Sequence, residues 1–266
     1  MTSKLDKVIV VKIGGATLGS QDTTIEDVVS LQKQGRSLVI VHGGGKTITE
    51  WLDKQDIPSQ FIRGERVTDR ATLEVVVAVL AGLVNKQIVA AINNRGGQAV
   101  GISGVDGALI QARIKDDELG YVGSVVKVNV DPLKVMLESG YIPVVAPVSL
   151  HSVDRPEETP QIVNINADDV AGEIAAAIGA EQLIFLTDVV GVCDRSGRLL
   201  PRLLPDEAEA LVASGVASGG MIPKIRACLR ALPSATAARI IDGRQPYALV
   251  REIEGESSGT TIQAGC

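Results

Sequence analysis

Aromatic residues are scarce in this chain of 266 residues: Trp, Tyr and Phe together make up 2% of it. A protein that stacks the bases of single-stranded nucleic acid on its surface needs aromatic side chains, so the composition argues against that class. The formal net charge of −6 likewise gives no overall attraction to nucleic acid or to an anionic membrane. An anionic substrate would therefore have to be bound by individual lysines and arginines.

Cysteines are few, and long uninterrupted apolar runs are absent. Cys193, Cys228 and Cys266 show no C-x-x-C spacing, which argues against a disulfide scaffold or a zinc site and fits a reducing cytoplasm. The start, MTSKLDK, does not resemble a secretory signal peptide. The most apolar stretch, 72–93, is broken by Glu74 and by an Asn-Lys-Gln triplet, so no part reaches the ~18 residues of a membrane span. We expect a cytoplasmic protein in which this stretch is a buried or subunit-interface helix.

Short runs rich in β-branched residues alternate with helix-like stretches along the chain. Several runs are continuously apolar, which is typical of strands buried on both faces of a parallel sheet. The strand-like runs are 8–15, 37–45, 98–104, 141–148, 182–191 and 238–243. The helix-like stretches are 22–34, 46–55, 69–94, 131–139, 167–179, 205–213 and 223–232. The alternation predicts an α/β fold, a three-layer αβα sandwich with a central, largely parallel sheet.

Two lobes and three irregular segments are expected within this fold, the third being a polar, proline-bearing loop at 151–161. A second series of strands begins near residue 180, which gives an amino-terminal lobe of 1–180 and a carboxy-terminal lobe of 181–266. The segment 61–69, FIRGERVTD, is expected to form a hairpin or flap. The segment 116–129 has the alternation of an exposed antiparallel hairpin.

Glycines lie where the predicted strands end. Gly14-Gly15 end the first strand, 43–45 end the second, and Gly191 ends a later one. Glycine lets backbone N–H groups approach a ligand, and the helix that follows presents further free N–H donors to an anion. Because ligands bind at the carboxyl ends of parallel strands, the repeated turns predict a phosphate cradle.

Known glycine motifs do not account for these turns. GGGKT at 43–47 resembles the end of a Walker A loop, but that motif requires glycine where Ile40 stands, and no G-x-G-x-x-G fingerprint is present. HGGG at 42–45 could form a hydrolase oxyanion hole, but the required G-x-S-x-G elbow is incomplete at 101–105. His42 is instead expected to brace its turn by hydrogen bonding.

Two lysines stand where a cation is unfavourable without a partner. Lys12 interrupts an apolar strand, and Lys224 lies at the start of a predicted helix, where it opposes the dipole. They are either separate surface lysines or a pair that shares an anion. The segment NINADD, 164–169, offers ordinary helix caps or, on a functional interpretation, places Asp168 between the two lysines.

Two further residues could hold a substrate. Asn164 could contact a ligand through its amide. Arg66 could bind a substrate carboxylate through two parallel hydrogen bonds, although an arginine of this kind is also often solvated.

Taken together, the motifs resemble the amino-acid kinase family and, within it, the N-acetylglutamate kinases. The resemblance covers nearly the whole chain. Its blocks are VKIGG, VHGGG, GERVTD, LAGLVNKQIV, GISGVDG, LGYVGSV, GYIPVVAPV, NINADDVAGEIAAAIGA, LTDVVGV, SGGMIPK and the closing DGR and SGTTI. UMP kinases and carbamate kinases are not expected to combine RVTD, NINAD and GGMIPK.

The resemblance implies a kinase that transfers the γ-phosphoryl group of MgATP to the γ-carboxylate of N-acetyl-L-glutamate in arginine biosynthesis. It implies that the amino-terminal lobe binds the acylated amino acid and that the carboxy-terminal lobe binds ATP. The implied catalytic residues are Lys12, Lys224, Asp168, Gly15 and Gly44. The implied substrate-binding residues are Gly44, Gly45, Arg66, Asn164 and Asn166. The implied nucleotide-binding residues are Lys12, Asp188, Val189, Val190, Gly191, Val192, Cys193, Val216, Ala217, Ser218 and Lys224.

No carboxylate cage for a metal is recognisable, so Mg²⁺ is expected on the ATP phosphates. Few residues precede the first strand, where arginine-inhibited members of the family carry an additional helix, and we expect a homodimer without arginine feedback. The family's flap usually reads GLRVTD, and here Glu65 replaces the leucine. Its carboxylate would either face solvent or lie beside the acyl pocket. The alternatives are a related kinase of an aminoadipate derivative and a non-catalytic nucleotide-binding regulator.

Overall fold

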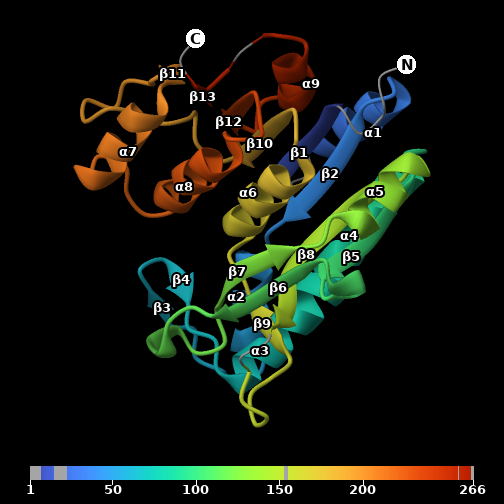
Figure 1. The fold of residues 1–266 in the computed structure, drawn as a ribbon, viewed down its shortest axis with the longest axis vertical. Helices are drawn as coiled ribbons and strands as arrows, with labels where there is room; N and C mark the ends of the chain where they lie inside the picture. The colour runs from blue at the N-terminus through green and yellow to red at the C-terminus, as the bar shows by residue number, and fades with distance from the viewer. Residues whose placement is uncertain (1–6, 15–22, 153–154, 257, 265–266) are drawn as a thin grey trace.

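The structure, a computed structural model, describes residues 7–14, 23–152, 155–256 and 258–264. Within them an 11-stranded sheet runs through the molecule in the order β11-β13-β12-β10-β1-β2-β8-β6-β7, with β5 and β9 also paired to β8 (Figure 1). The early strands are β1 (Val8–Ile13), β2 (Ser37–His42), β5 (Ala99–Gly104), β6 (Ile110–Ile114), β7 (Gly123–Val128), β8 (Ile142–His151) and β9 (Ile162–Asn164). The later strands are β10 (Gln182–Thr187), β11 (Arg202–Leu203), β12 (Ala237–Asp242) and β13 (Thr260–Ile262).

The centre of the sheet is parallel, as the sequence predicts. β1 pairs in parallel with β2 and β10, β2 with β8, and β10 with β12. Antiparallel pairs occur toward the edges, between β6 and β7, β8 and β9, and β12 and β13. Every residue of β1 is buried, because helices cover both faces of the sheet.

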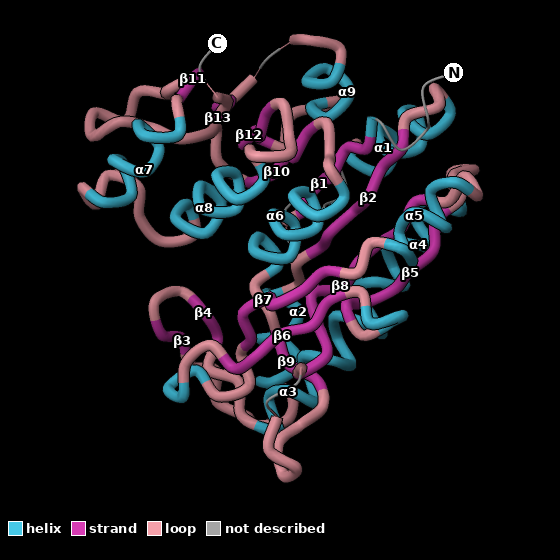
Figure 2. Tube along the Cα trace, in the orientation of Figure 1, coloured by secondary structure: helices cyan, strands magenta, loops and turns pink. Residues whose placement is uncertain are grey.

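Two layers of helices complete the predicted sandwich, and Figure 2 shows them on either side of the strands. One face carries α5 (Asp131–Glu138), α6 (Ala167–Ile178), α7 (Pro205–Ala213) and α8 (Met221–Ala231). The other carries α1 (Thr24–Lys33), α2 (Gly45–Asp53), α3 (Arg70–Val77), α4 (Asn85–Asn94) and α9 (Ala248–Ile253). Alternate residues of β1 enter the two cores: Val8 and Val10 face the first, and Ile9 and Val11 the second. The three-layer prediction is therefore confirmed.

The stretch predicted as one helix, 69–94, is a continuous helix with a wider turn in its middle. The segment η3 (Ala78–Val84) is π-helical and joins α3 to α4. Contrary to the sequence estimate, the whole run Arg70–Asn94 is long and apolar enough to cross a membrane, because the helix continues through Glu74 and the Asn-Lys-Gln triplet. The mean hydropathy of its most apolar window is 2.1. One face of this helix packs on the second core, through Val75, Val76, Val79, Leu80, Val84, Ile88 and Ile92.

Two details differ from the sequence predictions. The exposed hairpin is formed by β6 and β7, so it begins at Ile110, and 117–119 form a 3-10 turn within its loop. The short elements β9, β11, β13 and α9 were not predicted, because segments of two to six residues show too little periodicity. The flap is a hairpin as predicted, with β3 (Phe61–Ile62) and β4 (Glu65–Arg66) forming a separate two-stranded sheet.

Candidate active site

Asp168 lies between the two lysines that the sequence singled out. Its Oδ1 is 2.7 Å from Nζ of Lys12, and its Oδ2 is 2.9 Å from Nζ of Lys224. The three residues come from different elements: Lys12 from β1, Asp168 from the first turn of α6, and Lys224 from the first turn of α8. The side-chain oxygen of Asn166 caps α6 by accepting a hydrogen bond from the N–H of Asp168 at 2.8 Å. This cap fixes the backbone of Asp168 and so the position from which its carboxylate extends.

The electrostatic balance in this cluster keeps Asp168 ionised. Burial on its own would raise the pKa of Asp168, which is 4% exposed, but the ammonium groups of Lys12 and Lys224 outweigh burial and lower it below its usual value. One carboxylate between two ammonium groups leaves a net positive charge. The cluster can therefore attract an anion while its lysines remain fixed in place.

The glycine turn at 43–45 follows β2, the strand next to the one that carries Lys12, and leads into α2. Gly44 is the N-cap of α2, and Gly45 is its first residue, so their N–H groups belong to the unpaired first turn of the helix. A Cβ on Gly44 would lie 2.7 Å from Cδ2 of Leu80, which the π-helical turn brings against the loop. Only glycine fits this approach without displacing Leu80. Gly15, predicted to donate a second N–H group, lies outside the described residues.

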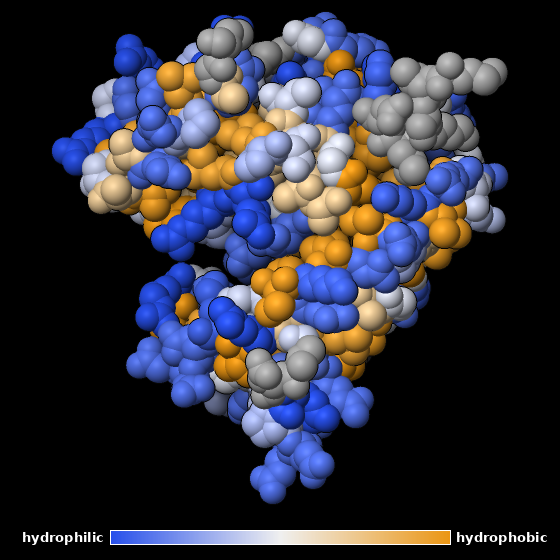
Figure 3. Space-filling view, viewed as in Figure 1, coloured by the Kyte–Doolittle hydropathy of each residue, from blue (hydrophilic) through white to orange (hydrophobic). Residues whose placement is uncertain are grey.

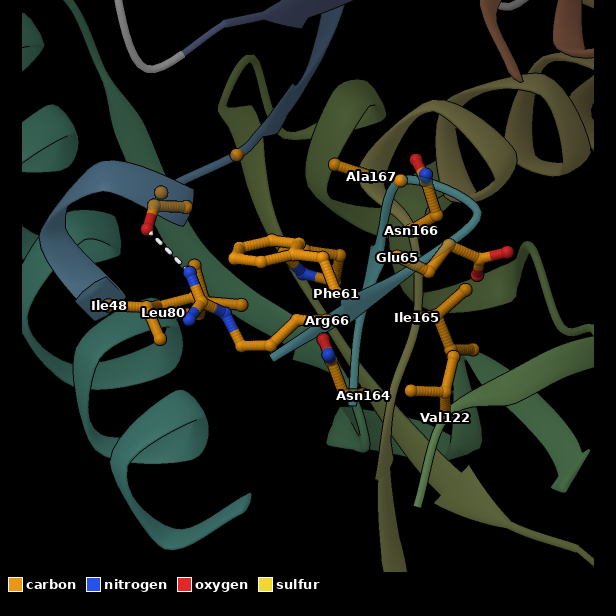
Figure 4. A pocket seen from close by; sticks show the side chains of 15 residues that line it. Ile48, Phe61, Glu65, Arg66, Leu80, Val122, Asn164, Ile165, Asn166 and Ala167 are labelled. Carbon is orange, nitrogen blue, oxygen red and sulfur yellow. Dashed lines mark hydrogen bonds between the residues drawn. The ribbon is translucent and has the colours of Figure 1, made fainter. Parts of the chain in front are cut away.

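Arg66 projects from the flap into a small cavity and is held there by protein partners (Figure 4). Its guanidinium donates hydrogen bonds to the carbonyl of Gly45 at 3.0 Å and to the hydroxyls of Thr49 and Ser59, each at 2.7 Å. The ring of Phe61 covers it at 4.6 Å from the centroid. These three hydrogen bonds use three of its five N–H donors, so two remain for a ligand.

The five predicted substrate-binding residues line one cavity. It has a volume of about 180 Å³ and lies between the flap, the start of α2 and the segment that leads into α6. Its lining includes Gly44, Gly45, Arg66, Asn164 and Asn166. Asn164 is oriented by a hydrogen bond from its amide to the hydroxyl of Thr68 at 3.2 Å. Sequence reasoning missed the apolar lining that Ile48, Phe61, Leu80 and Val122 supply. Phe61 lies in the predicted flap, and Leu80 and Val122 lie in the LAGLVNKQIV and LGYVGSV blocks, but no local feature marked these side chains as lining.

The predicted nucleotide-binding residues gather at a second cavity, of about 500 Å³, beyond the carboxyl end of β10. Its lining includes Asp188, Val189, Val190, Gly191, Val192, Cys193, Val216, Ala217 and Ser218. Lys12 and Lys224 do not line this cavity and belong to the cluster around Asp168. The side chains of Val189 and Val190 are 40% and 50% exposed, so the cavity has apolar surface to cover.

Three residues of the second cavity were not predicted. Asp194, Met221 and Arg244 also line it. Arg244 is held by two hydrogen bonds to the carboxylate of Asp242, both of 2.8 Å. These bonds are the main reason that the pKa of Asp242 is lowered. The only available signal was the inclusion of Met221 and Arg244 in the GGMIPK and DGR blocks.

His42 has a structural place, as predicted. Its Nδ1 donates to the carbonyl of Gly43 at 2.9 Å, and its Nε2 accepts from the amide of Asn85 at 3.2 Å. Burial lowers the pKa of His42 to about 4, so the ring is neutral. Both ring nitrogens are engaged, which argues against a role as a general base. Asn85 was missed: it ties α4 to the sheet by also donating to the carbonyl of Val144 at 2.9 Å.

An open space separates the flap from α8. It has a volume of about 710 Å³, and its lining includes Glu65, Lys115, Asp169, Gly220 and Arg226. Figure 3 shows this hollow with hydrophilic residues along its rim. Among the described residues, no three His, Cys, Asp or Glu side chains gather in a way that could hold a metal ion.

Comparison with known proteins gives a consistent result. The sequence model of the amino acid kinase family matches residues 7–242. An acetylglutamate kinase of Dehalococcoides mccartyi is 47% identical over 262 residues, which cover 98% of this chain and 96% of that protein. An acetylglutamate kinase of Thermosynechococcus vestitus is 49% identical over 268 residues, covering 97% of this chain and 88% of that protein. The crystal structure of smu.665 from Streptococcus mutans superposes with a TM-score of 0.83 at 29% identity, covering 98% of this chain and all of the other.

Proposed function

The chain belongs to the amino acid kinase family, and we propose that it is an acetylglutamate kinase, which transfers the γ-phosphoryl group of ATP to the γ-carboxylate of N-acetyl-L-glutamate. The observation that carries the proposal is the position of Asp168 between Lys12 and Lys224. Such a cluster presents fixed positive charge to a phosphoryl group in transit. The names of the relatives, at 47% to 49% identity over nearly the full chain, support the substrate.

The small cavity is the proposed site of N-acetyl-L-glutamate. Arg66 and the N–H groups at the start of α2 supply the donors that carboxylates require, and Asn164 supplies a neutral donor for an acyl carbonyl. The apolar side chains of Leu80 and Val122 can accommodate a methyl group. The cavity is mostly apolar with a few converging polar groups, as small-molecule sites usually are.

The nucleotide is proposed to bind in the second cavity, with its adenine against the exposed Val189 and Val190. Its phosphates would then extend toward Lys224 and Lys12. This assigns the acylated amino acid to the amino-terminal lobe, 1–180, and ATP to the carboxy-terminal lobe, 181–266. Mg²⁺ would be held by phosphate oxygens and would neutralise part of their charge, because Asp168 already has both oxygens on lysines.

The chemistry requires charge compensation rather than a base. A carboxylate with a reference pKa of about 4.3 is already ionised at neutral pH. Its approach to the γ-phosphoryl group is opposed by about 4 kcal/mol for like charges ~4 Å apart at an effective dielectric of 20. Lys12, Lys224 and the N–H groups of Gly44 and Gly15 would offset this repulsion and stabilise the charge of the transition state. Asp168 positions the lysines and takes no proton, since its pKa is lowered.

The assembly is proposed to be a cytoplasmic homodimer. The helix Arg70–Asn94 supports the dimer, because only 44% of its most apolar window is buried within one chain. A second copy could cover the rest of that apolar surface. Size-exclusion chromatography with light scattering tests this directly, against a chain mass of 27.8 kDa.

A hydroxylamine trap tests the activity. The enzyme is incubated with MgATP, hydroxylamine and N-acetyl-L-glutamate, and the acyl phosphate is measured as its hydroxamate. We expect product with this substrate, little with an N-acetylated aminoadipate, and none without ATP. More product with the longer acid would contradict the substrate assignment. No product with either acid would favour a nucleotide-binding regulator.

A further inference from the structure

Glu65 lies next to Arg66 and lines the rim of the same cavity, but its carboxylate points away from Arg66. In the flap, Phe61 is opposite Arg66 and Ile62 is opposite Glu65. Because successive side chains of a strand point to opposite faces, Phe61 and Arg66 share the cavity face and Glu65 belongs to the other. Figure 4 shows its carboxylate pointing away from Phe61 and Arg66. The carboxylate therefore adds no negative charge beside the guanidinium that would receive the substrate.

The partner of Glu65 is Lys115, which directly follows β6. Their charged atoms are 2.8 Å apart, with side-chain exposures of 18% for Glu65 and 35% for Lys115. Nζ of Lys115 also lies 3.8 Å from Oδ2 of Asp169, the residue after Asp168 in the first turn of α6. Lys115 thus connects the outer face of the flap to the helix that carries the centre of the lysine cluster.

A second ion pair joins the flap to the same segment, and here the flap supplies the cation and the segment the anion. Arg63, in the flap turn, pairs with Asp116 and lies 3.7 Å from Glu118. Along the flap the cation Arg63 precedes the anion Glu65. On the facing segment the cation Lys115, which pairs with Glu65, precedes the anion Asp116, which pairs with Arg63. Two such pairs specify one register, because a shift would bring like charges together.

We propose that Glu65 and Lys115 are positioning residues, which hold the flap against the body so that Arg66 and Phe61 stay over the substrate cavity. A sheet of two strands of two residues each is only marginally stable by itself, so the flap depends on contacts with the body. The hydrogen bonds of Arg66 hold its cavity face, and the Glu65–Lys115 pair holds its outer face. Loss of the pair would leave Arg66 in place for part of the time only. The inference rests on the proposed function solely in naming the acylated amino acid as the ligand that the flap covers.

Hydrogen exchange of the flap amides tests the anchor without reference to activity. We compare the full-length wild type with Glu65→Gln and Lys115→Met, which remove one charge each and keep the side-chain length. Exchange at 61–67 should become about three- to five-fold faster in either variant, as expected for a partly exposed ion pair. Exchange in β2 should not change. Glu26→Gln is the matched control, since it breaks the 2.6 Å pair with Arg95 on the far side of the molecule and should leave the flap unaffected.

The effects of Glu65→Gln and Lys115→Met on flap exchange should also be non-additive. If Glu65 and Lys115 act as one unit, the double variant should exchange no faster than either single variant, whereas independent effects would multiply. Lys115→Arg keeps the cation and should restore slow exchange. Steady-state kinetics should show the KM for N-acetyl-L-glutamate raised about three- to five-fold in Glu65→Gln, with the KM for ATP unchanged.

The outcomes separate this inference from the proposed function. Flap exchange that is unchanged in both single variants, or multiplied in the double variant, overturns the anchor even if the enzyme makes acyl phosphate. Faster exchange with a raised KM for ATP instead of the acylated amino acid overturns the role assigned to the flap. If the wild type makes no hydroxamate but the exchange pattern is as expected, the anchor stands and the proposed function fails.

Discussion

Leu80 occupies the space that a side chain on Gly44 would need. A Cβ at Gly44 would approach Cδ2 of Leu80 to 2.7 Å and Cγ2 of Val84 to 3.4 Å. Both neighbours belong to the π-helical turn, whose extra width places them against the loop that starts α2. The fit of the proposed phosphate-binding turn is thus set by a helix far from it in sequence.

Gly44→Ala should therefore lower kcat more than it lowers stability. The φ of Gly44, 171°, lies outside the left-handed region, so the effect expected of alanine is crowding against Leu80. Displacing the end of Leu80 should cost about 1 kcal/mol of unfolding free energy, at the low end for overpacking. The shifted turn would misplace its N–H donors, and kcat should fall at least ten-fold. Chemical denaturation and steady-state kinetics measure the two effects.

Leu80→Val is the matched second change, because it shortens the side chain that Gly44→Ala meets. The stability cost of Gly44→Ala should be smaller in the Leu80→Val background than in the wild type. Equal costs in the two backgrounds would show that the crowding lies elsewhere.

Lys12→Met and Lys224→Met should each reduce kcat about 100- to 1,000-fold, the usual effect of removing one charge-stabilising group from a transition state. The KM values should change much less, because the cavities that bind the two substrates do not include these lysines. Steady-state kinetics with each substrate varied in turn provide the measurement. An unchanged kcat in either variant would remove that lysine from the mechanism.

Asp168→Ala tests a different consequence of the same cluster. Lys12 is 8% exposed, so loss of its partner leaves a nearly buried cation beside a second cation. Removing one member of a buried ion pair costs about 3–5 kcal/mol, and we expect a loss of this order in unfolding free energy. The double variant Lys12→Met with Asp168→Ala should recover part of it. A variant as stable as the wild type would mean that the lysines are not held by Asp168.

Arg66→Lys separates charge from geometry in the substrate cavity. Lysine keeps the positive charge but cannot reproduce the planar hydrogen bonds to the carbonyl of Gly45 and the hydroxyl of Thr49. The KM for N-acetyl-L-glutamate should rise at least ten-fold, while the KM for ATP stays the same. An effect confined to ATP would contradict the placement of the acylated amino acid in this cavity.

Local sequence was sufficient for the parts of the molecule that depend on short-range chemistry. Lys12 and Lys224 were conspicuous because each is costly where it stands, and their shared partner was predictable from the capping segment before α6. The parallel sheet followed from continuously apolar runs such as β1. Glycines at strand ends indicated where the ligand-binding edge lies.

Features that depend on approach between distant segments were not predictable. The width of the π-helical turn at Leu80, and the direction of Glu65 on the flap, are set by packing that no local pattern encodes. The short helix α9 is a further case. Its first N–H groups are satisfied by the buried carboxylate of Asp27, which accepts from Leu249 at 3.1 Å across most of the chain length. Such a cap leaves no signal beside the helix that it stabilises.

The stability of the molecule should depend on the ionisation of Asp169. Burial raises the pKa of Asp169 from 3.8 to about 6, and nearby Glu65, Asp168 and Glu173 add to the rise against the opposing effect of Lys115. Since the folded state binds this proton more tightly than the unfolded state, the group stabilises the fold below pH ~4 and loses that contribution as the pH rises through about 6. Asp169→Asn removes the dependence. Its unfolding free energy relative to the wild type should therefore be about 1 kcal/mol higher at pH 7.5 than at pH 4, less than the full shift implies because a third of the side chain is exposed to water. Urea denaturation of both proteins at the two pH values measures this difference. A variant that is more stable relative to the wild type at pH 4 than at pH 7.5 would reverse the sign assigned to Asp169.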